Sequence, residues 1–350
     1  MSKVLVTGGA GYLGSVLVTC LIQEGYSVKV YDKFLFGKQS LERVKDRIEI
    51  IQGDIRNFNK EILDDVSYII HLAAFSNDPM AYYDKEANRQ INVGGTKILA
   101  EAAAQKENIK IFLYSSSASI YDKGIKAGGE EIQTEESSVD PKLPYSISKY
   151  EGERVLLEIM KEHPKFCPVI LRQGTLYGHS PRMRFDLVVN TFVRDAFTKG
   201  KLRVFCGGTQ WRPLADVFDT ARAYIEFIKY PNPEEMRGEI FNIVEGNYQV
   251  WDIAHRVKWA LKDIVNVGVE IDYSEFGIDR SYKISGKKLE DRLGFRYKNK
   301  IESAAEKIAL NIKRGEYGSD LNNSIYTNIE WIEYLKKIEN LIKDLGGQVF

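Results

Sequence analysis

The chain has 350 residues, of which 44% are hydrophobic, so it can bury a large core and is long enough for two domains. Lys plus Arg equals Asp plus Glu at 49 each, which leaves no net charge to attract nucleic acid or an anionic membrane surface. No apolar run approaches the roughly 20 residues of a membrane helix and no signal peptide precedes the first strand, so we expect a cytoplasmic protein. Cys20, Cys167 and Cys206 form no CxxC pair, and we expect reduced core residues with neither a disulfide nor a metal site.

The first predicted strand, residues 3–7, runs into three glycines spaced three apart, Gly8, Gly11 and Gly14. A helical apolar pattern follows over residues 12–21. Gly8 permits a tight reversal, Gly11 permits backbone to approach a pyrophosphate, and Gly14 permits the helix to lie close to the strand. The turn therefore predicts a dinucleotide at the helix N-terminus.

The second predicted strand, residues 27–31, ends at Asp32. A carboxylate at this place faces the hydroxyls of an adenosine ribose and repels a ribose phosphate, which favours NAD over NADP. Lys33 and Lys38 lie nearby and can neutralise an extra phosphate, so NADP stays open.

Strand and helix patterns continue to alternate, which is typical of a parallel sheet with helices on both faces. We expect strands at 48–52, 67–72, 109–114 and 167–171, and helices at 88–105 and 145–162. After Arg172 the regularity breaks into loops rich in Arg, Gly, Pro and Trp, which indicates a smaller domain. A helix at 218–228 and a strand at 238–244 return to the first domain.

The predicted organisation is thus a doubly wound α/β domain with a smaller, discontinuous C-terminal domain. The first covers residues 1–173 and about 214–246, the second about 174–213 and 247–300, and a helical tail covers 301–350. Apolar residues recur at helical spacing over 329–345, which predicts packing on the tail's own domain, with a partner helix as the alternative.

Tyr145 and Lys149 stand four residues apart, hence on one face of a helix. An adjacent cation and an oxidised nicotinamide both favour the phenolate, which makes the tyrosine a usable base near neutral pH. Two exposed helix residues are the alternative. A run of hydroxyls, Ser115 to Ser117 and Ser119, follows the strand at 109–114, where open parallel sheets place their ligands. A hydroxyl there can bond a reacting sugar oxygen.

These motifs in this order resemble the extended short-chain dehydrogenase/reductase family, in its NAD-dependent sugar-nucleotide epimerase and dehydratase branch, with a Rossmann-like fold. The likeness covers nearly the whole chain. It is carried by residues 7–14, Gly53-Asp54, 71–74, Asn92 with Gly95-Thr96, 115–121, Tyr145 with Lys149, 171–178, 207–214, 241–243, 279–282 and 293–295.

The resemblance implies Tyr145 as the catalytic base, Lys149 as its partner and a ribose ligand, and Ser117 as the hydroxyl that orients the substrate. Asp54 would touch the adenine, and Asn92 would lie near the active site. The full set implied for NAD is Gly8, Gly11, Tyr12, Leu13, Asp32, Lys33, Asp54, Ile55, Leu72, Ala73, Ala74, Asn92, Ser115, Tyr145 and Lys149.

The family also implies a nucleoside diphosphate sugar between the domains. Arg212 and Arg280 are the expected phosphate partners, because guanidinium groups match phosphate oxygens. Asn190 resembles a diphosphate-contacting asparagine, with a buried structural amide as the alternative. The full set expected at the substrate is Ser76, Asn77, Ser117, Ser119, His179, Asn190, Arg212 and Arg280.

The chain departs from the family's pattern in the sugar pocket. Dehydratases of this branch carry Thr-Asp-Glu where this chain has Ser117-Ala118-Ser119, so elimination of water is disfavoured. Asp122 replaces a glycine, and His179-Ser180-Pro181 replaces a proline, which changes the shape of the pocket. His179 can reach the substrate or be an ordinary loop histidine.

We therefore expect a cytoplasmic NAD enzyme that oxidises the C4 hydroxyl of a nucleotide sugar. Return of hydride to the other face of the ketone gives a 4-epimerase, which is the preferred reading, whereas release of the ketone gives a 4-dehydrogenase. An NAD-binding regulator without turnover is the third alternative, and the retained Tyr145, Lys149 and Ser117 argue against it. The helices at 88–105 and 145–162 are the family's usual dimer surface, so a homodimer is expected.

Overall fold

The structure is a computed structural model that describes residues 2–122, 131–265, 268–277 and 280–347. Its strands are β1 (Lys3–Thr7), β2 (Ser27–Asp32), β3 (Ile48–Gln52), β4 (Tyr68–His71), β5 (Ile111–Ser117), β6 (Ile132–Gln133), β7 (Pro168–Gln173), β8 (Thr175–Tyr177), β9 (Lys201–Phe205), β10 (Trp211–Asp216), β11 (Ile240–Ile243), β12 (Gly246–Gln249), β13 (Glu270–Ser274) and β14 (Lys283–Ile284). Its helices are α1 (Tyr12–Gln23), α2 (Asp78–Tyr83), α3 (Lys85–Arg89), α4 (Thr96–Ala104), α5 (Pro144–Glu162), α6 (Val188–Lys199), α7 (Val217–Lys229), α8 (Val250–Leu261), α9 (Lys287–Leu293), α10 (Ile301–Lys313) and α11 (Asn328–Asp344).

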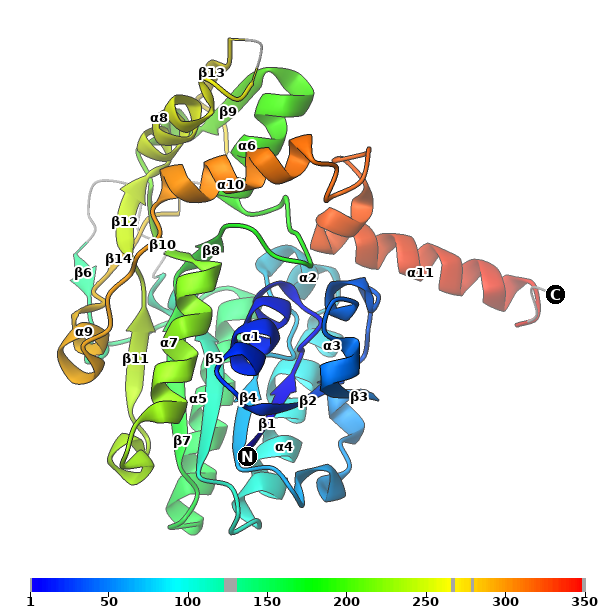
Figure 1. The fold of residues 1–350 in the computed structure, drawn as a ribbon, viewed down its shortest axis with the longest axis vertical. Helices are drawn as coiled ribbons and strands as arrows, with labels where there is room; N and C mark the ends of the chain where they lie inside the picture. Colours follow the sequence, from blue (N-terminus) through cyan, green and yellow to red (C-terminus); the bar gives the residue numbers. More distant parts are fainter. Residues whose placement is uncertain (1, 123–130, 266–267, 278–279, 348–350) are drawn as a thin grey trace.

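A seven-stranded parallel sheet in the order β11-β7-β5-β4-β1-β2-β3 forms the large domain (Figure 1). This confirms the doubly wound α/β class. Successive side chains of a strand face opposite sides, so Val4 and Val6 join the core under α1 and α7, whereas Leu5 joins the core under α4 and α5. The strand order reverses beside β1, and such a switch point opens a crevice at the carboxyl ends of the strands.

In the described part of the chain, three shorter sheets accompany the large one, and α10, expected as part of the tail, packs on α8 and α6. The sheets are β12-β10-β8, β13-β9 and β14-β6. The expected return of the chain to the large domain is present, because α7 packs on α1 and β11 pairs with β7. In Figure 1, α6, α8, α10 and β9 lie above the large sheet, whereas α9, β14 and β6 lie beside β11.

The single helix expected at 88–105 is interrupted in the structure. α3 ends at Arg89, a π-helical turn covers Gln90–Gly95, and α4 begins at Thr96. A Cβ atom on Gly95 would lie 2.5 Å from Ile55, so the backbone approaches its neighbour closely here. A π-turn of this kind often re-aims a side chain at a functional site, and here it carries Asn92.

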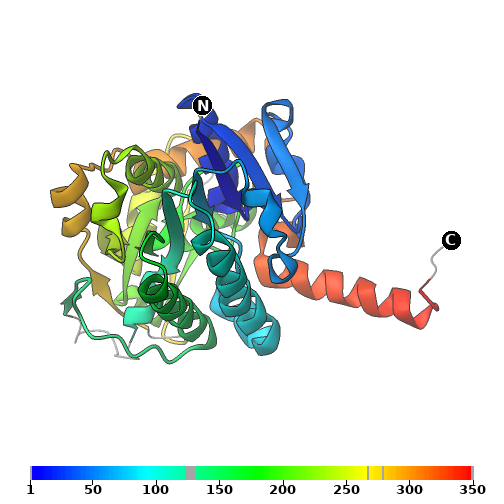
Figure 2. The same ribbon diagram turned by 90° about the horizontal axis from the view of Figure 1, so that it is seen from below.

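The tail differs from the expectation that it packs on its own domain. The first turn of α11 is anchored to the body, with Asn328 3% exposed, but the rest of the helix projects away from it (Figures 1 and 2). The apolar positions Tyr334, Ile338, Leu341 and Leu345 are 36–58% exposed. Helical periodicity correctly predicted the helix, but periodicity does not say whether an apolar stripe finds a partner within the same chain.

Candidate active site

A cavity of about 710 Å³ lies at the carboxyl ends of the large sheet, between the two domains. Its size is within the range of small-molecule sites. Of the residues expected from sequence, the following line it: Gly8, Gly11, Tyr12, Leu13, Asp32, Lys33, Asp54, Ile55, Leu72, Ala73, Ala74, Ser76, Asn77, Ser115, Ser117, Ser119, Tyr145, Arg212 and Arg280. Asn92, Lys149, His179 and Asn190 are not among the lining residues.

The glycine turn has no room for side chains. Gly8 has φ of 72°, and a Cβ atom there would lie 2.7 Å from the backbone nitrogen of Ala73. A Cβ atom on Gly14 would lie 2.2 Å from the carbonyl oxygen of Gly8. The N-terminus of α1 therefore comes close to the end of β1 and faces the cavity, which fits the pyrophosphate of a dinucleotide.

Asp32 ends β2 at the cavity wall, where its carboxylate accepts hydrogen bonds from the backbone nitrogens of Ala10 (2.9 Å) and Phe34 (2.7 Å). Burial raises the pKa of this carboxyl, against the effect of the two hydrogen bonds. Asp54 accepts from the Arg56 guanidinium (2.6 Å) and the Lys33 ammonium (2.8 Å). Lys33 is thus already paired with a carboxylate, which leaves it less suited to neutralise a ribose phosphate.

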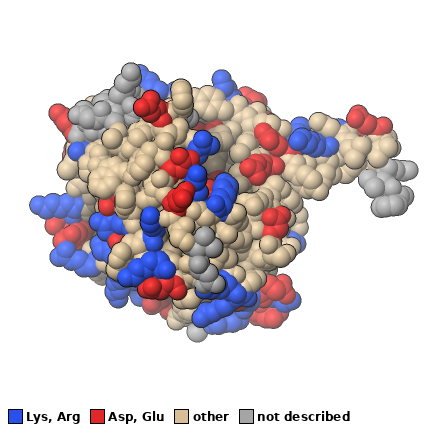
Figure 3. Space-filling view, turned by 90° about the horizontal axis from the view of Figure 1, so that it is seen from above, with Lys and Arg blue, Asp and Glu red and all other residues tan. Residues whose placement is uncertain are grey.

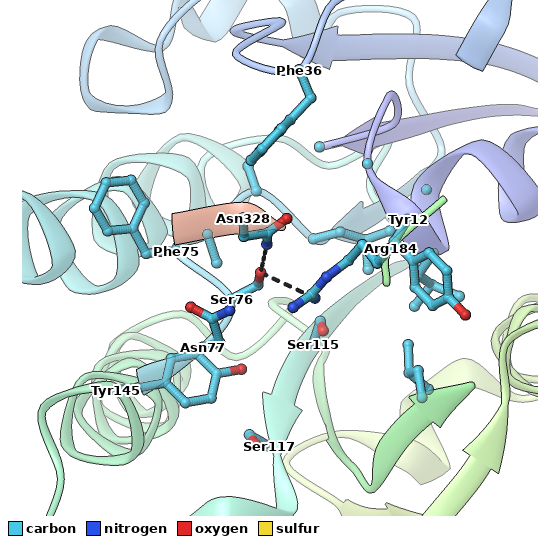
Figure 4. Close-up of a pocket in the computed structure, with 18 of the residues that line it drawn as sticks. Tyr12, Phe36, Phe75, Ser76, Asn77, Ser115, Ser117, Tyr145, Arg184 and Asn328 are labelled. Carbon is cyan, nitrogen blue, oxygen red and sulfur yellow. Dashed lines mark hydrogen bonds between the residues drawn. The ribbon is translucent and has the colours of Figure 1, made fainter. Parts of the chain in front are cut away.

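Tyr145 lies near the start of α5, and Ser117 ends β5 across the cavity (Figure 4). The Ser117 hydroxyl donates to the Ser119 hydroxyl over 2.9 Å. Burial raises the pKa of Tyr145, and the hydrogen bond with Ser117 opposes that rise. A lowered pKa was expected from the neighbouring ammonium, but in the protein alone the loss of hydration outweighs the polar neighbours.

Lys149 lies one helical turn after Tyr145 and is 3% exposed. Its ammonium donates to the carbonyl oxygen of Ser115 over 2.7 Å. Burial lowers the Lys149 pKa from 10.5 to about 7, and Glu153 opposes this shift. The lysine therefore stands behind the cavity wall as a buried proton-binding group, and its contact with a bound ribose remains a proposal.

Asn92 is buried behind the cavity and holds two segments that line it. Its side chain exchanges hydrogen bonds with the backbone of Phe75 (2.8 and 3.0 Å) and donates to the Ser148 hydroxyl (3.0 Å). The structure therefore gives it a positioning contact with the loop after β4 and with α5, where direct contact with the cofactor was expected.

His179 and Asn190 do not line the cavity, and protein partners hold their polar atoms. The His179 ring bonds the Tyr317 hydroxyl (2.7 Å), and burial lowers its pKa to about 4. Asn190 is fully buried, accepts from the backbone nitrogen of Gly178 (3.0 Å) and donates to the Tyr12 hydroxyl (2.9 Å). The alternative of a buried structural amide describes Asn190, because these partners occupy its polar atoms.

Arg212 and Arg280 line the cavity next to each other, and an Arg212 nitrogen donates to the carbonyl oxygen of Arg280. The Arg280 guanidinium also pairs with two carboxylates, Asp78 (2.7 Å) and Asp122. No local sequence pattern predicts these ion pairs, because the partners are far apart in the chain. They reduce the positive charge that Arg280 can offer to a phosphate.

Sequence reasoning missed several residues of the cavity wall. They include Phe36, Gln173, Arg182, Arg184, Asp186, Thr327, Asn328 and Ile329. The high density of arginine in their loop could have indicated Arg182 and Arg184 as partners of an anionic ligand. The three residues from the C-terminal segment belong to no recognisable motif, so only the tertiary structure could reveal them.

Among the described residues, no helix is long and apolar enough to cross a membrane, and no group of three or more His, Cys, Asp or Glu could hold a metal ion. The three cysteines are free. Both signs of charge occur across the face shown in Figure 3, from which α11 stands out.

The model of the NAD dependent epimerase/dehydratase family matches residues 4–243. The chain belongs to this family, so the protein is an enzyme of an NAD-dependent group, and the glycine turn with Asp32 fits that cofactor.

Two curated relatives and one solved structure illustrate its range. UDP-glucose 4-epimerase of Neisseria meningitidis serogroup C is 34% identical over 256 residues, which are 64% of this chain and 72% of that protein. Human dTDP-D-glucose 4,6-dehydratase is 28% identical over 252 residues, 69% of this chain and 68% of that protein. The structure of UDP-glucuronic acid 4-epimerase from Bacillus cereus, in complex with UDP-glucuronic acid and NAD, has a TM-score of 0.77 at 23% identity and covers 89% of this chain and 99% of its own. The last likeness shows the fold.

Proposed function

We propose that the protein uses NAD to oxidise the C4 hydroxyl of a nucleoside diphosphate sugar, as a sugar-nucleotide 4-epimerase. The observation that carries the proposal is one cavity that joins the glycine turn and Asp32 to Tyr145 and Ser117. When bound there, NAD supplies the hydride acceptor. A cytoplasmic location, expected from the sequence, belongs with this proposal.

In the proposed reaction the Ser117 hydroxyl bonds the C4 oxygen, and the Tyr145 side chain, as the phenolate, takes the proton of the C4 hydroxyl. The Lys149 ammonium stabilises the phenolate from behind the wall and, as the family resemblance implies, bonds the nicotinamide ribose. Asn92 holds the loop after β4 against α5. Arg212 and Arg280 bind the diphosphate, for which Arg280 exchanges part of its contact with Asp78 and Asp122.

An epimerase is preferred to a dehydratase because Ser117 and Ser119, which line the cavity, and Ala118 between them carry no carboxyl group. Loss of water from the sugar needs an acid and a base beyond the tyrosine. A 4-dehydrogenase that releases the ketone uses the same groups, so a product assay must separate it from the epimerase.

Replacement of Tyr145 by Phe should lower turnover about 10²–10⁴-fold, because the proton acceptor is lost while the ring remains. The assay incubates the purified protein with NAD and a panel of UDP, GDP, dTDP and CDP sugars, and follows both reduced cofactor and sugar configuration. Tyr334→Phe is the matched control, since Tyr334 lies on α11, 48% exposed. Undiminished turnover in Tyr145→Phe would reject the assigned base, and stoichiometric reduced cofactor without epimer would favour the dehydrogenase.

A further inference from the structure

Two arginines on the loop between β8 and α6 differ in their partners. Arg182 and Arg184 are each 7% exposed and both line the cavity. Arg184 donates two hydrogen bonds of 2.8 Å to the Asp186 carboxylate and a longer one to Ser76 (Figure 4). In the described part of the chain, no carboxylate forms an ion pair with Arg182. One of the two buried guanidinium groups is therefore neutralised and the other is not.

The Arg182 guanidinium keeps hydrogen-bond donors available. Its protein acceptors among the described residues are the side-chain oxygen of Asn328 (2.6 Å) and the carbonyl oxygen of Ile325 (3.4 Å), and both bond the same nitrogen, Nη2. The N–H groups of Nε and Nη1 are left without a protein acceptor in that part of the chain. The guanidinium also lies over the Phe36 ring, 3.9 Å from its centroid. A buried cation without a counter-ion is costly, and a planar guanidinium with free donors matches a phosphate.

Arg182 lies on the cofactor side of the cavity. Phe36, under the Arg182 guanidinium, belongs to the loop that follows Asp32, and Ser180, two residues before Arg182, donates to the backbone oxygen of Tyr12 at the start of α1 over 2.6 Å. Burial, reinforced by Arg184, lowers the Arg182 pKa to about 9, so the group still carries its charge at neutral pH. A phosphate beside the glycine turn would thus meet a positive charge as well as backbone N–H groups.

The C-terminal segment holds Arg182 in place. Asn328 is 3% exposed, and besides accepting from Arg182 it donates to the Ser76 hydroxyl over 2.9 Å (Figure 4). Trp331 donates from its indole nitrogen to the carbonyl oxygen of Leu35 over 2.6 Å, which ties the start of α11 to the loop after β2. This segment lies beyond the residues 4–243 that match the family model.

We propose that Arg182 binds a phosphate group of a nucleotide in this cavity, and that Asn328 is a positioning residue for its guanidinium. The inference rests on the proposed function, because that function supplies the nucleotide ligands. The phosphate can belong to the cofactor or to the nucleoside diphosphate of the sugar substrate. The position over Phe36, in the loop that follows Asp32, favours the cofactor.

The first experiment measures binding by calorimetry to Arg182→Gln. NAD is titrated into nucleotide-free protein, and UDP and GDP are titrated into protein saturated with NAD. We expect NAD affinity to fall at least about 10-fold with a weaker dependence on salt, because one charged contact is lost. A loss confined to UDP or GDP would assign the same phosphate contact to the substrate. Unchanged affinity for all three ligands would overturn the proposal.

Arg256→Gln is the matched control, since Arg256 is a half-buried arginine paired with Asp252 and Glu302. This substitution also removes one positive charge, but at a position that does not line the cavity, so it should leave the affinities for NAD, UDP and GDP unchanged. A cooperative thermal unfolding transition is the test that each variant is folded. Tyr145→Phe should bind NAD like the unaltered protein while losing turnover, so failure of the phosphate contact and failure of the proposed reaction are distinguishable.

The second experiment uses Asn328→Asp, which keeps an acceptor for Arg182 but supplies a carboxylate beside it. If Arg182 serves a phosphate, the internal ion pair should compete with the ligand and lower NAD affinity at least about 10-fold without lowering the unfolding midpoint. Asn328→Ala removes the acceptor and should lower affinity by a smaller factor. Unchanged affinity in a folded Asn328→Asp protein would show that Asn328 does not position a ligand-binding cation.

Discussion

At the scale of the residue, the site contains a lysine, Lys149, whose charged form is disfavoured by burial. The Lys149 ammonium is 3% exposed and donates to a carbonyl oxygen, and the attraction of the Glu153 carboxylate offsets the loss of hydration only in part. This explains why the Lys149 pKa falls to about 7. A group whose proton is held so weakly can respond to a ligand's charge near neutral pH.

This burial predicts a change in how stability depends on pH. Between pH 7 and 10.5 the unfolded chain binds a proton at Lys149 that the folded chain has largely released, so the free energy of unfolding should rise with pH through that window. The slope contributed is at most about 1.4 kcal/mol per pH unit. Lys149→Met should lack this contribution.

The measurement is urea denaturation of nucleotide-free wild-type and Lys149→Met protein at several values from pH 7 to 9. The wild-type protein should gain stability relative to the variant as the pH rises. Parallel curves would contradict the buried ammonium.

At the scale of the element, α5 is fixed to the sheet by a buried polar network. Glu153 accepts from the Ser116 hydroxyl of β5 (2.5 Å) and from two nitrogens of Arg172 on β7 (2.7 and 3.0 Å). Arg172 donates in turn to the Tyr121 hydroxyl (2.8 Å). Because Tyr145 and Lys149 precede Glu153 on the same helix, this network sets their distance from the serines that end β5.

Glu153→Gln should destabilise the protein by about 3–5 kcal/mol, because it leaves the Arg172 guanidinium buried without a counter-ion. Replacing both residues by Leu should recover much of that loss, since no charge then stays buried. Urea denaturation measures both effects. A loss below about 1 kcal/mol in Glu153→Gln, the size of an exposed ion pair, would contradict this role.

At the scale of the whole molecule, large apolar side chains are open to solvent on several elements, among them α5 and α11. The outer positions of α5 include Ile147, which is 38% exposed, and the projecting half of α11 carries Ile338, Leu341 and Leu345. The side-chain hydrogen bonds and ion pairs described for residues 336–347 join residues of that segment to one another. The projecting half of α11 therefore adds little to the stability of the rest of the protein, which carries the site.

We expect a homodimer in solution through the outer faces of α4 and α5, where the family resemblance places it. Small-angle scattering at working concentration should give twice the mass of the chain. A chain that ends at Lys337 should give a dimer as well, because it keeps α4 and α5. A monomeric mass for the full chain would reject the dimer, and a monomeric mass for the shortened chain alone would assign the contact to α11.

The sequence by itself determined the parallel sheet, because alternating apolar periods and the glycine turn are local properties of the chain. It also determined the chemical groups at the carboxyl ends of the strands, since residues such as Asp32, Ser117 and Tyr145 stand at fixed offsets from those elements. The bounds of some elements differ from those predicted where contacts between distant segments shape the backbone, as in the π-turn that carries Asn92.

Only the tertiary structure decided which groups face the cavity and which are held by the protein itself. His179 and Asn190 have their partners in segments distant in sequence, and so does Arg182, whose guanidinium is placed by Asn328, 146 residues further along the chain. Burial and pairing depend on which segments meet in space, and no local pattern encodes that meeting. For this reason many residues that line the cavity could be predicted from the sequence, whereas the pairing and burial of its charged groups could not.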